Sequence, residues 1–188
     1  MRIISGKYRG HVLRPPTGLP VRPTTDRAKE SLFNILENKY YLDEINVLDL
    51  FSGTGNVAFE FASRGATEVI CVDKYPKCCK YIYSEAQKMG LDQIHTITED
   101  VLHFIKDCPT QFSIIFADPP YEMANQETII GLIFEKELLK ENGMLIWEHH
   151  KNLSFENQKY YIETRKYGDS AFSFFENKTN IYSKHNAK

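Results

Sequence analysis

Val47–Asn56, the sequence VLDLFSGTGN, predicts a buried strand that runs into a glycine-rich turn and the start of a helix. Gly53 and Gly55 allow the backbone to turn tightly and to pass close to a ligand. In an open parallel sheet such a turn lies at the carboxyl ends of the strands, where ligands bind. The spacing is G-x-G without the third glycine of the dinucleotide fingerprint, which argues against a pyrophosphate ligand.

Short apolar runs alternate with helical patterns beyond this turn. We expect strands at Asn46–Phe51, Glu68–Asp73, Ile94–Thr98, Ser113–Asp118 and Gly143–Glu148, and helices at Val57–Arg64, Pro76–Met89, Val101–Lys106 and Gln126–Lys140. Such alternation predicts a parallel sheet with helices on both faces. Tyr160–Lys166 and Ser170–Asn177 are expected to close it as an antiparallel hairpin. The predicted fold is α/β and Rossmann-like: a doubly wound, mostly parallel seven-stranded sheet.

The N-terminal part predicts two smaller elements ahead of the sheet. Arg2–Ser5 and His11–Arg14 flank a turn bounded by glycines and are expected to form a small β-hairpin. A helix is expected from Thr25 or Asp26, because Ala28, Leu32, Ile35 and Leu36 recur at the helical period.

Three aspartates occur in order at the ends of the first three predicted strands. Asp49 lies four residues before Gly53. A carboxylate at that position disfavours a phosphate ligand but suits a cationic amino-acid group. Asp73 can accept both hydroxyls of a ribose, and Asp100 can meet an adenine edge. Taken singly, the three are a turn former, a helix cap and a surface charge. Their ordered recurrence predicts S-adenosylmethionine as the cofactor.

Asp118-Pro119-Pro120-Tyr121 follows the fourth predicted strand and suits methylation of an exocyclic base amine. Such an amine is a poor nucleophile because its lone pair is delocalised into the ring. Asp118 and the Pro119 carbonyl can accept its two N–H groups and localise the lone pair, while the prolines fix the backbone. Tyr121 can stack on the base. The alternative is a strand that ends in a proline-rich turn with a packed tyrosine.

Charge is distributed unevenly along the chain. Residues 1–30 carry seven basic and two acidic side chains, a balance of +5, so the remainder carries −7 within a total of −2. A basic segment on an acidic body suits local phosphate contacts, and the alternative is a solvated extension. We expect a cytoplasmic protein with reduced thiols and no metal, since signal-peptide, membrane-spanning and metal-site patterns are missing from the sequence.

With these motifs the chain resembles class I S-adenosylmethionine-dependent methyltransferases from residue 1 to about 176. Arg2–Gly10 followed by Arg22–Asn34, which contains Arg-Pro-Thr-Thr-Asp-Arg, resembles the RsmD family more specifically. That family methylates N2 of one guanine in bacterial small-subunit (16S) ribosomal RNA.

The resemblance implies roles for particular residues of this chain. It implies cofactor binding by Asp49, Gly53, Gly55, Asp73 and Asp100, handling of the base by Asp118, Pro119 and Tyr121, and RNA or active-site contacts by Arg22, Thr24, Asp26 and Arg27. From the charge pattern we add phosphate contacts by Arg9 and Arg14.

We therefore expect three parts: a basic RNA-docking extension at residues 1–40, a methyltransferase domain at 41–177 and a polar tail at 178–188. The expected partner is ribosomal RNA within a small-subunit assembly intermediate, bound by a monomer, with no DNA or membrane partner. Two other functions stay open: an adenine-N6 nucleic-acid methyltransferase, because adenine N6 is also an exocyclic amine, and a non-catalytic RNA-binding assembly factor.

Overall fold

The computed structural model describes residues 1–19 and 24–176. Its strands are β1 (Asn46–Leu50), β2 (Glu68–Asp73), β3 (Ile94–Thr98), β4 (Phe112–Ala117), β5 (Leu139–His150), β6 (Tyr161–Tyr167) and β7 (Ser170–Glu176). Its helices are α1 (Asp26–Glu37), α2 (Asn56–Ser63), α3 (Pro76–Met89), α4 (Val101–Asp107) and α5 (Gln126–Glu135), with a short 3-10 helix at Leu42–Glu44.

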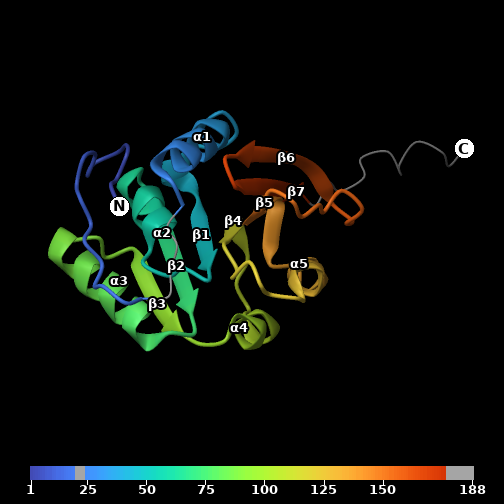
Figure 1. Ribbon diagram of the computed structural model, residues 1–188. Helices are drawn as coiled ribbons and strands as arrows, with labels where there is room; N and C mark the ends of the chain where they lie inside the picture. Colours follow the sequence, from blue (N-terminus) through green and yellow to red (C-terminus); the bar gives the residue numbers. More distant parts are fainter. Residues whose placement is uncertain (20–23, 177–188) are drawn as a thin grey trace, which may run out of the picture.

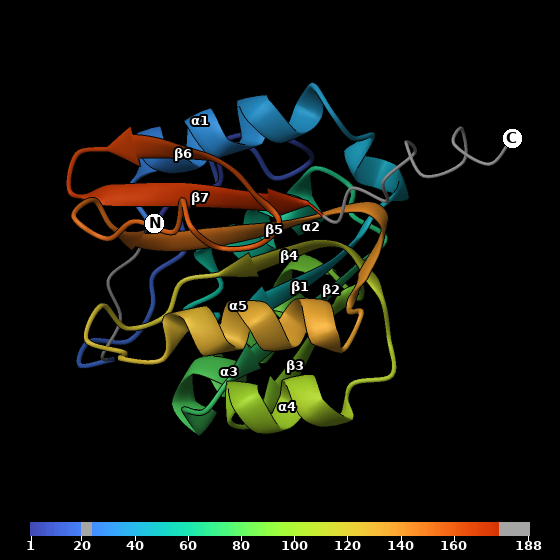
Figure 2. The same ribbon diagram turned by 90° about the vertical axis from the view of Figure 1, so that its right-hand side faces the viewer.

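All seven strands form one sheet in the order β3-β2-β1-β4-β5-β7-β6 (Figures 1 and 2). Neighbouring strands from β3 to β5 are parallel, whereas β7 pairs antiparallel with β5 and β6 antiparallel with β7. The predicted Rossmann-like α/β fold with an antiparallel C-terminal hairpin is confirmed. The carboxyl ends of the parallel strands therefore meet at one edge of the sheet.

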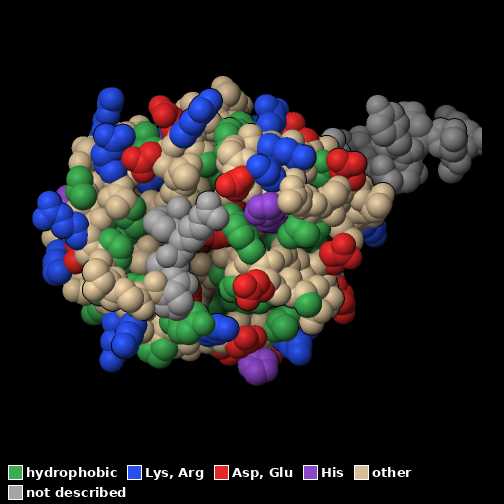
Figure 3. Space-filling view, in the orientation of Figure 1, with side chains coloured by type: hydrophobic (Ala, Val, Ile, Leu, Met, Phe, Trp, Pro, Cys, Tyr) green, Lys and Arg blue, Asp and Glu red, His purple; other side chains and the backbone are tan. Residues whose placement is uncertain are grey.

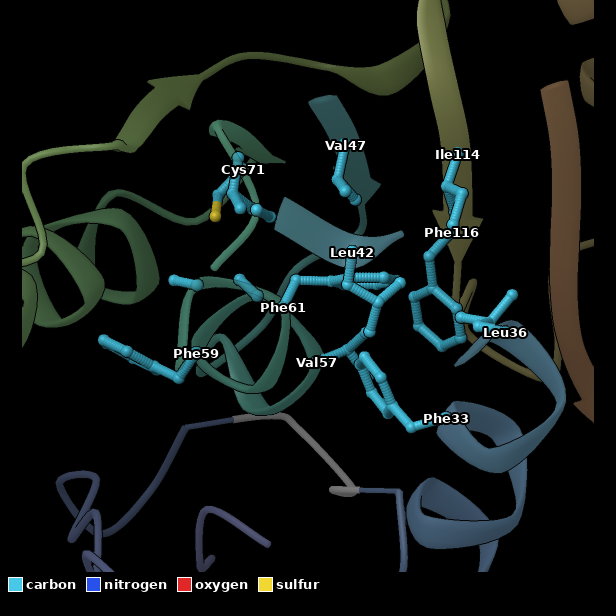
Figure 4. Close-up of a cluster of buried hydrophobic side chains, with 14 of the residues drawn as sticks. Phe33, Leu36, Leu42, Val47, Val57, Phe59, Phe61, Cys71, Ile114 and Phe116 are labelled. Atoms are coloured by element: carbon cyan, nitrogen blue, oxygen red, sulfur yellow. The ribbon is translucent and has the colours of Figure 1, made fainter. Parts of the chain in front are cut away.

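Helices cover both faces of the sheet, as the short apolar strands predicted. Successive strand residues point to opposite faces, so Val47 belongs to one core cluster and Leu48 to the other. Side chains of α1, α2 and α3 pack against strand side chains in the first cluster, shown in Figure 4 around Phe33, Phe59, Phe61, Ile114 and Phe116. The second contains Phe104 of α4 and Ile129 of α5. No helix of the described part is long and apolar enough to cross a membrane.

The boundary between α5 and β5 differs from the prediction. α5 ends at Glu135, and Leu139 already pairs with Phe112 of β4. Glu137 adopts a φ of 53°, and the N–H of Leu138 donates to the Ile133 carbonyl at 3.1 Å, which is the Schellman way of ending a helix. The predicted helix to Lys140 was wrong because Leu138 and Leu139 continue its apolar pattern.

The N-terminal segment, residues 1–14, packs on α2. Of the predicted hairpin only one antiparallel bridge forms, between Arg2 and Val12. Ile3 is 1 % exposed and Leu13 is 2 % exposed, both within the first core cluster. This segment is thus anchored by its own apolar side chains.

A turn of this segment also fits closely against the carboxyl end of α2. Lys7 N–H donates to the Ser63 carbonyl at 2.7 Å. Gly6 has a φ of 80°, and a Cβ there would lie 1.9 Å from the Ser63 oxygen. Only glycine fits at this approach.

Candidate active site

A cavity of about 350 Å³ opens at the carboxyl edge of the parallel strands. The chain places β2 and β3 on one side of β1 and β4 and β5 on the other, and such a switch point is where open α/β sheets bind ligands. Eight of the predicted residues line the cavity together: Thr24, Asp49, Gly53, Asp73, Asp100, Asp118, Pro119 and Tyr121. Residues far apart in the sequence are thus brought to one site.

The turn between β1 and α2 forms part of the cavity wall. Phe51 and Gly53 both line the cavity with left-handed backbone, at φ of 58° and 53°; such a φ is uncommon for phenylalanine. Gly55 has a φ of 74°, and a Cβ on it would lie 3.0 Å from Ile82 and 3.1 Å from Phe59. A side chain at residue 55 would therefore strain the turn and crowd the helices behind it.

Asp49 is a buried carboxylate with an unused acceptor. It is 2 % exposed, and its Oδ2 has no hydrogen-bond partner among the described residues. Burial raises the pKa of the Asp49 carboxyl well above its usual range, and the nearby Asp73 carboxylate raises it further, whereas the Ala58 N–H opposes the shift. A cationic ammonium group bound here would supply both the missing partner and the missing countercharge.

Asp73 and Asp100 each organise the backbone beside the cavity. Asp73 Oδ2 accepts the N–H of Gly53 and Oδ1 accepts the N–H of Tyr75, both at 2.8 Å. Asp100 caps α4 by accepting the Leu102 N–H at 2.9 Å. A carboxylate oxygen has more than one lone pair, so both side chains can also meet a ligand. A capping role and a ligand-binding role are therefore compatible for each of them.

Acidic side chains outnumber basic ones in the cavity wall. Five carboxylates line it, with one lysine, Lys74, among the described lining residues. This balance disfavours a phosphate and suits a cation. Nowhere in the described ranges do three or more His, Cys, Asp or Glu side chains come together as a metal site needs.

Asp118 and Tyr121 lie where β4 ends, on the side of the cavity away from β2. The N–H of Asp118 donates to the Leu50 carbonyl at 3.4 Å, which ties it to β1. The Tyr121 hydroxyl lies 2.9 Å from Ser170 Oγ, and its ring centroid lies 5.7 Å from that of His150 in an edge arrangement. The C-terminal hairpin thus holds the aromatic ring that was predicted to stack on a base.

A buried polar chain that the sequence did not reveal runs behind the cavity. Lys29 Nζ lies 3.3 Å from Glu60 Oε2 and donates to Asn56 Oδ1 at 2.9 Å. Asn56 Nδ2 donates to the Thr24 carbonyl at 2.9 Å, and Thr24 Oγ1 donates to Glu148 Oε2 at 2.7 Å. Charged residues in amphipathic patterns are normally expected to be exposed. For this polar chain, the only sequence signal of burial was the set of apolar neighbours of Glu148 in its strand.

The predicted RNA-contact residues do not all meet the cavity. Three exposed arginines lie outside its wall: Arg9, Arg14 and Arg27. Asp26 also lies outside it and pairs with Arg2 at 3.4 Å. Arg22 lies outside the described residues. Figure 3 shows lysine and arginine side chains spread along the upper edge of the molecule, with acidic side chains among them.

The chain is similar to proteins of known sequence and structure over most of its length. A family model described as conserved hypothetical protein 95 matches residues 1–176. A Bacillus subtilis protein with the provisional name of an rRNA methyltransferase is 35% identical, over 81% of this chain and 84% of its own. The ribosomal RNA small subunit methyltransferase D of Haemophilus influenzae is 33% identical, over 81% and 80%. The solved structure of a hypothetical protein of Thermus thermophilus has a TM-score of 0.83 and 28% identity, covering 94% of this chain and 99% of that one.

Proposed function

This chain belongs to the RsmD family, described as conserved hypothetical protein 95, and we propose that it methylates the exocyclic N2 amine of one guanine in small-subunit (16S) ribosomal RNA. Two of its relatives are named as rRNA methyltransferases. The observation that carries the proposal is a single cavity in which three strand-end aspartates lie together with Asp118 and Tyr121.

S-adenosylmethionine supplies an electrophilic methyl group bound to a sulfonium. Asp49 would hold its ammonium group, because the buried Oδ2 is an acceptor without a partner among the described residues. Asp73 would accept the ribose hydroxyls and Asp100 would meet the adenine. Gly53 and Gly55 let the turn approach the cofactor closely. The acidic wall supports a cationic cofactor over a nucleotide phosphate.

The acceptor amine would be bound at the other end of the cavity. Asp118 and the Pro119 carbonyl accept its two N–H groups, which shifts the lone pair from the ring toward the methyl group. Tyr121 stacks on the base, with its hydroxyl already held by Ser170 at 2.9 Å. These groups act on the attacking nitrogen, so their removal affects the rate of transfer more than cofactor binding.

The RNA partner would be engaged chiefly through the basic N-terminal part. In this proposal residues 1–40 dock the RNA and residues 41–177 transfer the methyl group, in the cytoplasm, where the substrate is assembled. Phosphate contacts by arginines position an RNA without reading its sequence. The base enters the cavity only after leaving its helix.

Product analysis tests the proposed function. The full chain is incubated with methyl-labelled S-adenosylmethionine and either small-subunit particles or free 16S RNA, and the RNA is digested to nucleosides. We expect N2-methylguanosine at one position, formed roughly a hundredfold or more slowly by Asp118→Ala. N6-methyladenosine would instead support the adenine methyltransferase. Cofactor binding without any methylated nucleoside on either substrate would support the non-catalytic assembly factor.

A further inference from the structure

The hydroxyl of Thr24 sits in the cavity wall with its proton already committed. Thr24 is 7 % exposed, and its Oγ1 donates to Oε2 of Glu148 at 2.7 Å. Glu148 is 2 % exposed and belongs to β5. Ala117, the last residue of β4, pairs with Trp147 of β5, so Glu148 of β5 lies beside Asp118, the residue that follows β4. Thr24 therefore lies at the acceptor end of the cavity, near Asp118.

The main chain of Thr24 is fixed as firmly as its side chain. Its carbonyl accepts a hydrogen bond from Asn56 Nδ2 at 2.9 Å, and Asn56 Oδ1 accepts one from the buried Lys29 at 2.9 Å. Asn56 is the first residue of α2 and also lines the cavity. The orientation of the Thr24 hydroxyl is thus set from two sides before any ligand binds.

A threonine hydroxyl has one proton to donate and two lone pairs. Because that proton is given to the Glu148 carboxylate, the hydroxyl can act toward a bound base only as an acceptor. Guanine carries an N1–H donor next to its C2 amine, whereas adenine carries an N1 lone pair next to its C6 amine. An acceptor at this place can take a hydrogen bond from the N1–H of guanine, whereas it would repel the N1 lone pair of adenine.

Building on the proposed function, we infer that Thr24, oriented by Glu148, is a specificity-determining residue that accepts the N1–H of the target guanine. Asp118 and the Pro119 carbonyl suit any exocyclic amine, so they do not choose between guanine N2 and adenine N6. The neighbouring ring nitrogen makes that choice. A site that hydrogen-bonds such a group discriminates strongly against an analogue that lacks it, and we expect at least about tenfold here.

The test uses a base that keeps the target amine but reverses the N1 group. Once the methylated guanosine has been mapped, a synthetic RNA segment carrying 2-aminopurine riboside at that position is ligated into the small-subunit RNA. 2-Aminopurine has the C2 amine and an N1 lone pair in place of N1–H. The ratio of kcat/KM for guanine to that for 2-aminopurine is measured for the wild type, Thr24→Val and Thr24→Ser. 2-Aminopurine also lacks O6, but this loss is common to all variants and cancels when their ratios are compared.

The wild type should prefer guanine at least about tenfold, Thr24→Ser should keep that preference, and Thr24→Val should bring the ratio toward one by losing rate on guanine. Glu148→Gln tests the same role through the partner of Thr24. The glutamine amide can donate a hydrogen bond to Thr24, which frees the threonine proton to face the cavity. The ratio of kcat/KM for guanine to that for 2-aminopurine should therefore fall in this variant too. Unchanged S-adenosylmethionine affinity by calorimetry shows that each variant is folded.

Two failures are distinguishable. If the wild type makes N2-methylguanosine but Thr24→Val and Glu148→Gln leave the ratio unchanged, or slow both bases equally, the role of Thr24 is wrong and the proposed function stands. If no N2-methylguanosine forms on any substrate, the proposed function fails and the reading of guanine by Thr24 fails with it.

Discussion

At the scale of single residues, substitution of Asp118 should slow catalysis without weakening cofactor binding. Asp118→Ala removes one preorganised acceptor of the attacking amine and should lower kcat by roughly a hundredfold or more. Asp118→Asn is the sharper change, because it keeps the shape but loses the charge and one acceptor. S-adenosylmethionine affinity, measured by calorimetry, should stay nearly unchanged in both variants. Near-normal kcat in Asp118→Asn would remove Asp118 from the reaction.

Asp49 should show opposite effects on stability and on binding. In the folded protein burial raises the pKa of Asp49 well above its usual range, while the unfolded chain has the ordinary value of about 4. Between these two values the folded state binds more protons, so the stability that this group contributes is lost as pH rises. The side chain at position 49 of the Asp49→Asn variant cannot titrate. At neutral pH, when both proteins are compared without cofactor, the variant should be more stable than the wild type. It should nevertheless bind S-adenosylmethionine weakly.

The measurement for Asp49 is urea unfolding of both proteins without cofactor from about pH 5 to pH 8. The difference in unfolding free energy should grow by about 1.4 kcal/mol for each pH unit. It should level off once the pH has passed the raised pKa of Asp49. A constant difference across this range, or normal cofactor affinity of Asp49→Asn, contradicts the assignment.

At the scale of elements, the N-terminal segment separates two arginines that the sequence placed together. Lys7 and Tyr8 bond to Ser63 at the carboxyl end of α2. Leu13, in contrast, donates to the Met1 carbonyl, and Met1 Sδ lies 3.4 Å from Thr54 Oγ1 in the cavity wall. Arg9 therefore lies toward the edge of the sheet opposite the cavity, and Arg14 lies toward the cavity.

Arg14→Ala and Arg9→Ala form a matched pair for RNA docking, because each removes one exposed positive charge. Arg14→Ala should weaken RNA binding and lower the logarithmic salt slope by roughly 0.7–0.9, the share of one phosphate contact. Arg9→Ala should leave the slope unchanged. The measurement is a salt titration of RNA binding by both variants and the wild type. Equal slopes for all three would mean that neither arginine contacts a phosphate of the RNA.

The limits of elements that have clear hydrophobic periodicity and marked ends were predictable from the sequence. Limits that depend on the backbone conformation of one residue were not. β2, β3 and α3 have the predicted limits because apolar runs or proline and glycine mark their ends. α5 stops early because Glu137 turns left-handed, and nothing in its residue type requires that.

The candidate site divides in the same way. Asp49, Asp73 and Asp118 were predictable because strand order alone brings their positions to one edge. The Thr24–Glu148 contact joins residues 124 positions apart, and the burial of Lys29 depends on α1 packing against α2 and the N-terminal segment. Such contacts are fixed by tertiary packing, so the local pattern contains no signal for them.

At the scale of the whole molecule, the N-terminal segment is part of the main core. Ile3 and Leu13 are buried in the cluster that also contains Val47 of β1. The Glu60 carboxylate, 0 % exposed, accepts the N–H groups of Ile4 and Ser5 at 2.8 and 3.0 Å. The sequence predicts residues 1–40 as an RNA-docking extension separate from the methyltransferase domain. These contacts instead favour a segment on which the stability of the sheet domain depends.

Deleting residues 1–13 should therefore destabilise the whole chain. Exposure of the sites filled by Ile3 and Leu13 should cost about 1.5–3 kcal/mol for each side chain, and Glu60 loses two donors while it remains near the buried Lys29. The sum is a large part of the about 5–15 kcal/mol that stabilises a typical domain. Urea unfolding of the truncated chain should show a much lower midpoint, and cofactor binding should weaken with it. Arg9→Ala, which changes charge in the same segment but removes no buried group, is the control and should unfold like the wild type. If the truncated chain keeps the wild-type midpoint, the segment is separable and serves docking alone.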